Sequence, residues 1–359
     1  MMKLSMRKII CFTDSLGSGG AQRQLVGLAC LLKEQGYDVS VLLYYDNPFY
    51  KPALDKAGIE SVIIGNTANP IKRLWKLYRY FKKLPCDVVI SYQETPSLIA
   101  SIFRPLLKWP KLIVSERNTT QKLTIKDKIR FWLYRFADTI VPNSYSQANF
   151  INSTYPRLSS KVNIITNFVD TDKFRATNDR KRGNKLVVVA SDKPEKNFER
   201  FVEAIVLVKQ RGLTIKAEWY GIRGAVLYKY QDLVETRGVA DMLDIYPPQT
   251  DIQEVYQNAD YFCLPSLFEG FPNVLCEAMS CGLPVICSNV CDNPHIVKET
   301  VNGFLFDPYN VRQIADSIER IALLPKAEYD AISSNNVERS EQMFSKVAFI
   351  DKYIKIIEA

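Results

Sequence analysis

The sequence predicts an α/β protein in which each half of the chain forms a doubly wound parallel sheet. The 359 residues suffice for two domains, at roughly 100 to 200 residues per domain. Hydrophobic residues make up 47% and charged residues 24%, the proportions of a globular protein, which excludes disorder, collagen and coiled coil. Short apolar runs alternate with amphipathic helical stretches, and this alternation is typical of parallel sheets with helices on both faces.

The first half, residues 1–170, is expected to form an N-terminal domain. It opens with a strand at residues 8–12, a glycine-rich turn and a helix at residues 21–35, which Gly36 ends. Helical stretches separate most of the strands that follow. These strands are predicted at residues 39–44, 61–64, 88–91, 112–115 and 139–142.

The second half, residues 171–340, restarts the same rhythm after a polar, charged stretch at residues 175–185, where we expect the linker. The end of the chain, residues 341–359, is expected to be a helix that packs back on the N-terminal domain, with an amphipathic pattern over 342–357. Strands of the second domain are predicted at residues 186–190, 214–220, 244–246, 261–265, 284–288 and 303–306. Its helices are predicted at residues 198–210, 227–237, 252–258 and 274–280.

Cysteine and histidine usage argues against disulfides and zinc. The eight cysteines lie mostly inside apolar runs and form no C-x-x-C pair, so we expect reduced core thiols. His295 is the only histidine, which leaves a zinc site too few ligands. The apolar runs are too short for a signal peptide or a membrane span, so we expect a cytosolic protein.

The net charge of +8 conceals an asymmetry between the two halves. Residues 1–170 carry 24 Lys and Arg against 12 Asp and Glu, a balance of +12, and the remaining 23 basic and 27 acidic residues give −4. A basic half is typical of proteins that meet nucleic acid or an anionic membrane surface. No nucleic-acid recognition motif accompanies the charge, so we expect no nucleic-acid partner.

The densest functional signal is the segment 265–286, which reads as strand, glycine turn, helix, glycine and strand. The turn 270–273 is predicted to present unpaired backbone N–H groups at a helix N-terminus, a site suited to a diphosphate that Gly270 lets come close. Glu269 lies on the loop before this turn, and Glu277 lies about one turn into the helix. Two acids therefore flank one anion site. The plainer interpretation is a solvated Glu269 and a favourable helix charge at Glu277, worth roughly 0.3–1 kcal/mol.

This segment resembles the E-x7-E motif of the retaining family 4 glycosyltransferases, enzymes of the GT-B fold, in which two Rossmann-like domains face each other across a cleft. The spacing from Glu269 to Glu277 and the flanking P-S-x-x-E-G-F-P and E-A-M-x-x-G-x-P-V match. The resemblance implies that Glu277 binds the nucleotide ribose and that Glu269 approaches the donor sugar. It also implies that sugar hydroxyls and diphosphate are held by the backbone of Gly270, Phe271, Pro272, Asn273 and Val274.

A second segment, A-S-D-K-P-E-K-N at residues 190–197, resembles the family's G-R-x-x-x-x-K segment. It places Lys196 where the family lysine neutralises the leaving diphosphate, and a solvated loop lysine is the alternative. Ser191 stands at the family's arginine position, so the second positive charge is expected from Lys193 or Arg223. Lys196 and Glu269 are the expected catalytic residues.

Near the N-terminus, D-S-L-G-S-G-G-A at residues 14–21 follows the first strand and opens a helix. The segment fails the G-x-G-x-x-G dinucleotide pattern at Gln22 and resembles the family's G-G-A-E/Q-R loop. This resemblance implies that Gly19 and Gly20 let the backbone approach the diphosphate and the acceptor. A glycine turn with purely structural duty is the alternative.

At three further places the sequence departs from the family pattern or resembles a different motif. Many relatives carry a histidine where this chain reads E-R-N, and Arg117 and Asn118 are expected either to contact sugar or acceptor or to serve only the loop. His295 is interpreted as a surface residue. Asp170 and Asp172 look like a D-x-D metal motif, but their context resembles the family's interdomain segment, so we expect a structural Asp170 and no metal.

The resemblance implies a reaction that retains configuration and needs no metal or other cofactor. Breaking a sugar–diphosphate bond leaves positive character at the anomeric carbon and negative charge on the leaving oxygens, and each needs a stabiliser. The expected donor is a nucleotide-diphosphate sugar, a UDP-hexose or UDP-N-acetylhexosamine. Relatives build cell-surface polysaccharides such as lipopolysaccharide and capsule on lipid diphosphates, so a glycan or polyprenyl-diphosphate-linked acceptor is expected at the basic half.

Residues 71–83 place apolar side chains at helical spacing with cations between them, which is typical of a helix at a membrane interface. Residues 122–136 form a second basic and aromatic stretch. Together they predict peripheral attachment to an anionic membrane surface, the inner face of the plasma membrane, through Lys72 to Lys83. A helix that buries this stripe in its own domain is a compatible alternative.

Two other functions stay open on the sequence. A nicotinamide-dependent dehydrogenase fits the alternation of strands and helices but lacks the glycine fingerprint. A sugar-binding or membrane-attached scaffold without catalysis fits Ser191 and the missing histidine after the fifth strand.

Overall fold

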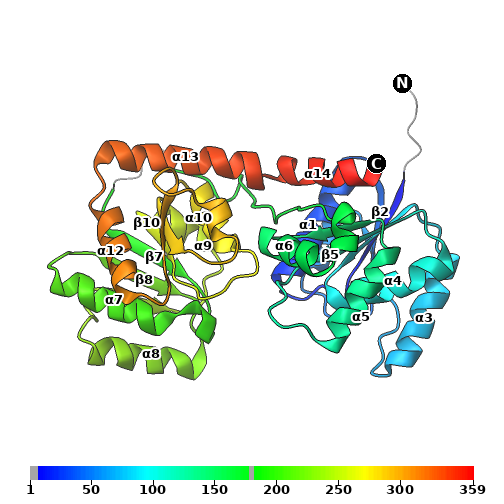
Figure 1. Cartoon of the computed structure of the whole chain (residues 1–359), viewed down its shortest axis with the longest axis horizontal. Helices are drawn as coiled ribbons and strands as arrows, with labels where there is room; N and C mark the ends of the chain where they lie inside the picture. The colour runs from blue at the N-terminus through cyan, green and yellow to red at the C-terminus, as the bar shows by residue number, and fades with distance from the viewer. Residues whose placement is uncertain (1–6, 178–181) are drawn as a thin grey trace. The chain divides into compact units, whose positions relative to one another are not determined.

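The computed structural model describes residues 7–177 and 182–359. The chain divides into two compact units (Figure 1). Unit 1 contains residues Met1–Asn167 and Phe349–Ala359, and unit 2 contains residues Phe168–Ala348. Each unit is built on a six-stranded sheet in which every assigned strand pair is parallel. The prediction of an α/β protein with two doubly wound sheets is therefore confirmed.

Unit 1 has the strand order β3-β2-β1-β4-β5-β6. Its strands are β1 (Lys8–Phe12), β2 (Asp38–Leu43), β3 (Glu60–Ile63), β4 (Val88–Tyr92), β5 (Lys111–Glu116) and β6 (Thr139–Pro142). The ends of these strands lie within one residue of the predicted ends. The agreement is close because short apolar runs bounded by polar turns leave little room for a shift when both sheet faces are buried.

Three helices of unit 1 cover the same face of its sheet. The helices of this unit are α1 (Gly20–Glu34), α2 (Lys51–Lys56), α3 (Pro70–Lys83), α4 (Glu94–Leu107), α5 (Ile125–Leu133) and α6 (Tyr145–Thr154). The strand order reverses after β3, and right-handed crossovers then place α3, α4 and α5 together on one face. Leu77, Phe103 and Phe131 from these three helices share one apolar core with Leu112 of β5.

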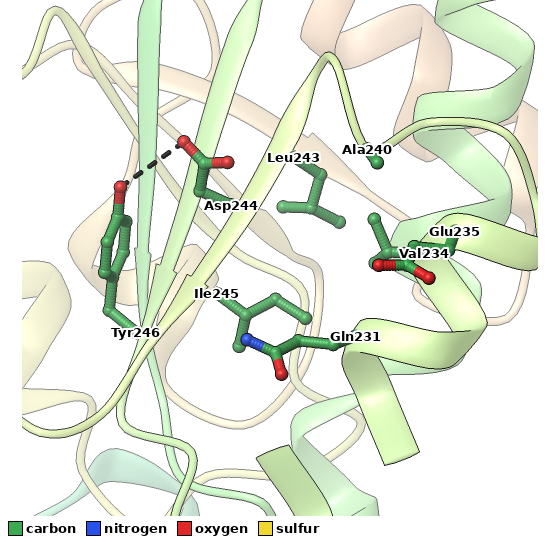
Figure 2. Close-up of a pocket in the computed structure, with 8 residues that line it drawn as sticks. All are labelled: Gln231, Val234, Glu235, Ala240, Leu243, Asp244, Ile245 and Tyr246. Carbon is green, nitrogen blue, oxygen red and sulfur yellow. Dashed lines mark hydrogen bonds between the residues drawn. The ribbon is translucent and has the colours of Figure 1, made fainter. Parts of the chain in front are cut away.

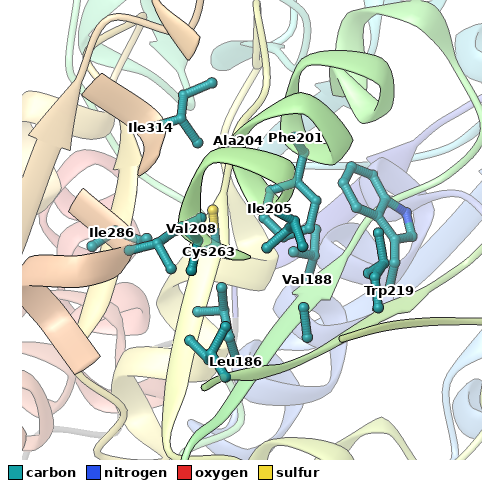
Figure 3. Packing of buried hydrophobic residues seen from close by; sticks show 14 of the residues in the cluster. Leu186, Val188, Phe201, Ala204, Ile205, Val208, Trp219, Cys263, Ile286 and Ile314 are labelled. Atoms are coloured by element: carbon teal, nitrogen blue, oxygen red, sulfur yellow. The ribbon is translucent and has the colours of Figure 1, made fainter. Parts of the chain in front are cut away.

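Unit 2 has the strand order β12-β11-β10-β7-β8-β9. Its strands are β7 (Lys185–Val189), β8 (Lys216–Tyr220), β9 (Leu243–Tyr246), β10 (Tyr261–Leu264), β11 (Val285–Ser288) and β12 (Gly303–Phe306). Figure 3 shows the core on one face of this sheet, where Leu186 and Val188 of β7 and Trp219 of β8 lie against Phe201. Phe201 belongs to α7 (Phe198–Gln210).

Helices surround the unit 2 sheet, and three of those in the described residues were not predicted. The predicted helices correspond to α7, α8 (Gly224–Thr236), α9 (Ile252–Gln257) and α10 (Asn273–Ser280). The additional ones are α12 (Val311–Ala322) and α13 (Lys326–Phe344), with a single turn of helix at α11 (Asn293–Ile296). The predicted final helix at 342–357 is interrupted, because α13 ends at Phe344 and α14 (Lys346–Glu358) begins after Ser345.

The boundary between the units lies earlier than the linker expected at residues 175–185. Val169 and Phe174 are buried in a core of unit 2, so the polar stretch begins inside this unit. Residues 178–181 of the expected linker lie outside the described residues. The polar composition therefore falls within unit 2 and does not mark the boundary between the units.

The last residues of the chain, 349–359, pack in unit 1. The hydroxyl of Tyr353 lies 2.9 Å from that of Tyr92, and both side chains are buried. Arg7 donates from Nη1 to the carbonyl of Ile357 at 2.6 Å and pairs through Nη2 with Glu358 at 3.0 Å. These contacts hold most of α14 against the first sheet.

Candidate functional site

The carboxyl edge of the unit 2 sheet brings three loops together. Strands β8, β7 and β10 are neighbours in the sheet, so the loops that follow them emerge side by side. These loops contain residues 190–197 after β7, 221–223 after β8 and 265–272 after β10. Ligands of open parallel sheets bind at this edge. The residues predicted as donor site in this half therefore gather at one edge.

Lys196 and Glu269, the two expected catalytic residues, form an ion pair. Nζ of Lys196 lies 2.7 Å from Oε1 of Glu269, and the hydroxyl of Ser266 donates to the same oxygen at 2.7 Å. Glu269 is 8% exposed, so salt screens this pair less than one on the open surface. An ammonium has three N–H donors, and this pair uses one of them. The arrangement fixes a cation at the sheet edge while leaving it able to bind an anion.

Asn197 holds the turn that carries this lysine, a role that we did not predict. Its φ of +64° lies in the left-handed region, which asparagine adopts more readily than most residues. Its Nδ2 donates to the carbonyl of Pro265 at 2.9 Å, and the N–H of Leu267 donates to the carbonyl of Glu195 at 2.7 Å. These bonds tie the loop after β7 to the loop after β10, which explains how the ion pair forms.

The glycine turn offers fewer N–H donors than we predicted. Pro272 has no N–H, and the N–H of Asn273 donates to the carbonyl of Phe271 at 3.0 Å. Within residues 7–177 and 182–359, the N–H groups of Gly270, Phe271 and Val274 have no protein acceptor. A Cβ placed on Gly270 would meet no atom within 4 Å, so this side of the turn is open. Three donors therefore remain at the start of α10.

Glu277 lies on the first turns of α10, close to these donors in sequence, and is 4% exposed. Its Oε2 accepts a hydrogen bond from the hydroxyl of Tyr256 at 3.4 Å. Tyr256 comes from α9 and is fully buried. This partner could not be predicted from the sequence, because the two residues are 21 positions apart and no motif links them.

Ser191, Lys193 and Arg223 lie on the two adjoining loops of the same edge. Ser191 is half-buried, whereas Lys193 and Arg223 are exposed. The two loops touch at Gly221, where an added Cβ would lie 2.4 Å from the carbonyl oxygen of Ala190. Neither cation is in an ion pair in the described parts of the chain. Both therefore stay candidates for the second positive charge.

A half-buried thiol lies beside this pair. The N–H of Glu269 points to Sγ of Cys291 at 3.5 Å, and Cys291 follows β11, the neighbour of β10. Burial raises the pKa of the Cys291 thiol, and the hydrogen bond from the Glu269 N–H opposes this effect. This contact places the thiol one residue from the glycine turn.

The two predicted glycines of unit 1 lie at the start of α1, and both are exposed. A Cβ on Gly19 would lie 2.3 Å from Oε1 of Gln22, whose amide donates to Asp14 at 3.2 Å. A side chain at residue 19 would therefore require the amide of Gln22 to move. Gly20 is the first residue of the helix and faces solvent at the carboxyl edge of β1.

Arg117 lies inside unit 1, whereas contact with sugar or acceptor was one of its two expected roles. It is 6% exposed and stacks at 4.0 Å over the ring of Tyr92. Its guanidinium donates to Oδ1 of Asn167 at 3.1 Å and to the hydroxyl of Tyr353 at 2.7 Å. These contacts give Arg117 a structural role, because they hold the C-terminal residues to the sheet. The next residue, Asn118, is exposed.

A buried ionic network lies behind the Asn118 loop. Arg130 pairs with Glu116 at 3.3 Å, and Tyr134 donates a short hydrogen bond to the same carboxylate. Gln147 donates to Glu116 at 3.2 Å and accepts from the N–H of Thr120 at 2.8 Å, so the network anchors this loop. Burial raises the pKa of the Glu116 carboxyl, an effect that Arg130 opposes.

The D-x-D pair and the single histidine take no part in the contacts of Lys196 and Glu269. Nζ of Lys346 lies 2.6 Å from Asp170 and 3.2 Å from Asp172, so the two carboxylates share a cation at the start of α14. This pairing agrees with a structural role for Asp170. His295 is exposed, and its carbonyl accepts from Arg339 at 2.7 Å.

A groove of about 400 Å³ lies between α8 and β9, away from the predicted residues. Figure 2 shows Gln231 and Glu235 on the helix side and Asp244 and Tyr246 on the strand side. The hydroxyl of Tyr246 donates to Asp244 at 3.3 Å. None of the residues that line this groove belongs to the donor motifs, so we assign it no part in the site.

Helix α3 exists as predicted, and it divides its side chains between core and surface. Leu77 and Phe81 are buried, whereas Ile71 and Trp75 are 77% and 56% exposed. Five of the six cations of this helix are exposed, and the sixth, Arg73, stacks on Tyr44 and Tyr45 at 5.1 and 4.4 Å. No helix in the described ranges is long and apolar enough to cross a bilayer.

Comparison with known proteins adds to this geometry. The D-inositol 3-phosphate glycosyltransferase of Salinispora tropica is 27% identical over 234 residues, which are 58% of this chain and 48% of that protein. This chain therefore spans about half the length of that relative. The UDP-Gal:alpha-D-GlcNAc-diphosphoundecaprenol alpha-1,3-galactosyltransferase of Escherichia coli is 24% identical over 330 residues, 84% of each chain.

A likeness in structure extends over the whole chain. HepE of Anabaena, crystallised in complex with UDP, aligns with a TM-score of 0.84 and 18% identity over 98% of this chain and 99% of its own. This likeness shows the GT-B fold. Two family models divide the chain between them: residues 18–173 match glycosyltransferase family 4, and residues 169–339 match glycosyl transferases group 1. The chain therefore belongs to the glycosyltransferases of group 1 and family 4.

Proposed function

We propose that the protein is a retaining glycosyltransferase that moves a hexosyl or N-acetylhexosaminyl group from a UDP-sugar to a hydroxyl of a lipid-linked or glycan acceptor in cell-surface polysaccharide synthesis. The ion pair of Lys196 and Glu269 beside the first turn of α10 carries this proposal. The sheet edge therefore presents a cation next to backbone N–H donors. A leaving diphosphate requires both. The UDP bound by HepE supports the donor, and the diphosphoundecaprenol substrate of the E. coli relative supports the acceptor.

In the proposed reaction, negative charge develops on the diphosphate as its bond to the anomeric carbon breaks. The Lys196 ammonium and the N–H groups of Phe271 and Val274 stabilise this charge from fixed positions, so little reorganisation is needed. The acceptor oxygen attacks the same face of the sugar, and its proton passes to the departing phosphate oxygen. The mechanism therefore uses no protein base and no metal ion.

The other residues of the edge position the donor in this proposal. Glu269 orients Lys196 and lies next to the place of the sugar, while Glu277 accepts hydrogen bonds from the ribose hydroxyls. Lys193 or Arg223 supplies the second positive charge that Ser191 cannot provide. A buried carboxylate binds hydroxyls well because it is already desolvated and held by a neighbour, here Tyr256 for Glu277.

A panel of nucleotide sugars tests the donor assignment. We expect UDP and its matching UDP-sugar to raise the unfolding temperature, because a ligand that binds only the folded chain stabilises it by about 2.7 kcal/mol at 100 times its Kd. The same ligand should slow alkylation of Cys291 by iodoacetamide, since this thiol lies beside Glu269. Stabilisation without protection of Cys291 would place the ligand elsewhere, and stabilisation by NADH alone would favour the dehydrogenase.

The membrane arm of the proposal concerns α3. We propose that the protein attaches to the inner face of the plasma membrane through the exposed cations between Lys72 and Lys83, each contributing at most about 1 kcal/mol. Lys76→Glu, Arg79→Glu and Lys83→Glu together should lower the fraction that cosediments with anionic vesicles by about tenfold or more. The control reverses three exposed cations on other helices and turns of unit 1, Lys33, Lys56 and Arg157. Equal cosedimentation of both variants would contradict the assignment.

A further inference from the structure

Helix α5 departs from an ordinary amphipathic helix, because beside Phe131 it buries two charged residues and it exposes three large apolar side chains. Its buried residues include Asp127 and Arg130. Ile125, Ile129 and Trp132 are 78%, 50% and 56% exposed. These three residues are four and three positions apart, so they form one stripe along the outer side of the helix.

The buried face of α5 fixes this orientation. Arg130 is 1% exposed and lies 3.1 Å from Glu94, 3.2 Å from Asp127 and 3.3 Å from Glu116. Rotating the helix to bury its apolar stripe would break these pairs and leave the buried Glu116 without its cation, which is strongly unfavourable. The outward apolar stripe is therefore built into the fold of unit 1.

The surroundings of the stripe are cationic. Lys122, Lys126, Lys128 and Arg135 are exposed, and the guanidinium of Arg135 lies 3.8 Å from the centroid of the Trp132 ring. The only acidic residue between positions 117 and 136 is Asp127, which faces inward. An apolar stripe with a tryptophan, flanked by cations of its own segment, is complementary to the interface of an anionic bilayer.

The neighbouring helices also expose large apolar side chains. Helices α3 and α4 cover the same face of the sheet as α5, and Figure 1 shows the three together in unit 1. Trp75 of α3 and Leu106 of α4 are 56% and 61% exposed. Large apolar side chains therefore reach solvent from all three helices of this face.

We propose that the stripe of Ile125, Ile129 and Trp132 inserts into the interfacial region of an anionic bilayer, so that apolar insertion and charge together hold unit 1. The stripe begins seven residues after the exposed Asn118, on the helix that follows the β5 loop. Insertion would bring this loop close to the lipid surface, where a lipid-linked acceptor presents its sugar. The choice of a bilayer as the occupant rests on the proposed function and on the charge around the stripe.

The test removes the apolar surface without changing charge. Ile129→Ser with Trp132→Ser should lower partitioning onto vesicles of phosphatidylglycerol and phosphatidylcholine by about tenfold or more, because insertion energy scales with buried apolar area. The control is Tyr228→Ser with Leu323→Ser, which removes two side chains of unit 2 that are 74% and 63% exposed. Partitioning of the first variant equal to that of the control would overturn the proposal.

Fluorescence gives a second readout that needs no loss of binding. In a Trp75→Phe background, Trp132 is the exposed tryptophan, because Trp109 and Trp219 are 4% and 0% exposed. Vesicles that contain brominated phospholipids should quench its emission and shift it to the blue. Emission that does not change while the protein is vesicle-bound would contradict insertion. The proposal would also be contradicted if the chain self-associates and Trp132→Ser abolishes this association without changing vesicle binding. The stripe would then contact a second copy.

The two proposals fail separately. Binding of UDP-glucose without vesicles reports on unit 2 and should be the same in the Ile129→Ser/Trp132→Ser variant as in the unmodified chain. Vesicle insertion with no binding of any nucleotide sugar would support the bilayer proposal for α5 and contradict the proposed transferase function. Normal sugar-nucleotide binding with no insertion would contradict only the proposal that the α5 stripe enters a bilayer.

Discussion

Lys196→Ala should lower kcat/KM for the sugar donor by about 10²- to 10³-fold, as removal of one preorganised charge-stabilising group does in other enzymes. The side chain holds its ammonium 2.7 Å from Glu269 at the edge where the proposed diphosphate departs. Removing it takes away the cation and leaves the buried Glu269 as an unpaired negative charge facing an anion. Both effects act on the transition state, so kcat should fall along with kcat/KM.

Glu277→Ala should chiefly weaken the binding of the sugar donor, because this carboxylate is assigned to the ribose and not to the bond that breaks. Far-ultraviolet circular dichroism and the unfolding temperature check that both variants keep their fold. Lys229→Ala is the matched control, an exposed lysine of unit 2 on α8. Turnover near that of the unmodified chain in Lys196→Ala or Glu277→Ala would contradict the site.

Arg130→Met should lower the free energy of unfolding of unit 1 by about 3–5 kcal/mol, the usual cost of removing one partner of a buried ion pair. Arg130 and Glu116 are both 1% exposed, so the variant would leave a buried carboxylate without a cation. Denaturant unfolding followed by tryptophan emission reports mainly on this unit, since Trp75, Trp109 and Trp132 belong to it. Arg135→Met, on the exposed side next to α5, is the control.

The loss in Arg130→Met should depend on pH in a defined direction. Burial already raises the pKa of Glu116, so the folded state binds this proton more tightly than the unfolded chain does. The contribution of such a group to stability increases as pH falls through its folded pKa. Acidification from pH 7.5 towards 5 should therefore recover part of the loss, and Glu116→Gln added to Arg130→Met should recover part of it at pH 7.5. A loss below about 1 kcal/mol, or one that grows on acidification, would contradict this account.

The strands and the donor motif could be predicted because their signals are local. The six strands of unit 1 lie where short apolar runs meet turn residues, and Glu269, Glu277 and Lys196 follow strands or open a helix. Their contacts could not be predicted. The bond from Asn197 to Pro265 joins loops 68 residues apart, and only the folded sheet brings them together.

The missed helix and the observed contacts of Arg117 share a physical cause, which is that tertiary contacts override a local pattern. Helix α13 was missed because it buries polar residues such as Asn336, whose amide donates to the carbonyls of Leu283 and Asn302, and this blurs its apolar periodicity. Arg117 follows a strand, as site residues do, yet its partner Tyr353 lies 236 residues away. In α5, Phe131 is buried whereas Ile125, Ile129 and Trp132 are exposed, so apolar periodicity alone does not identify its buried face.

The central claim is that unit 2 binds the diphosphate of a sugar nucleotide at the start of α10. Crystals grown with UDP-glucose or the best ligand of the panel test it most directly. We expect density for the diphosphate within hydrogen-bond distance of Lys196 Nζ and the Val274 N–H, with the ribose at Glu277. Density for the nucleotide bound to unit 1 alone, or to unit 2 away from residues 269–277, would contradict the claim.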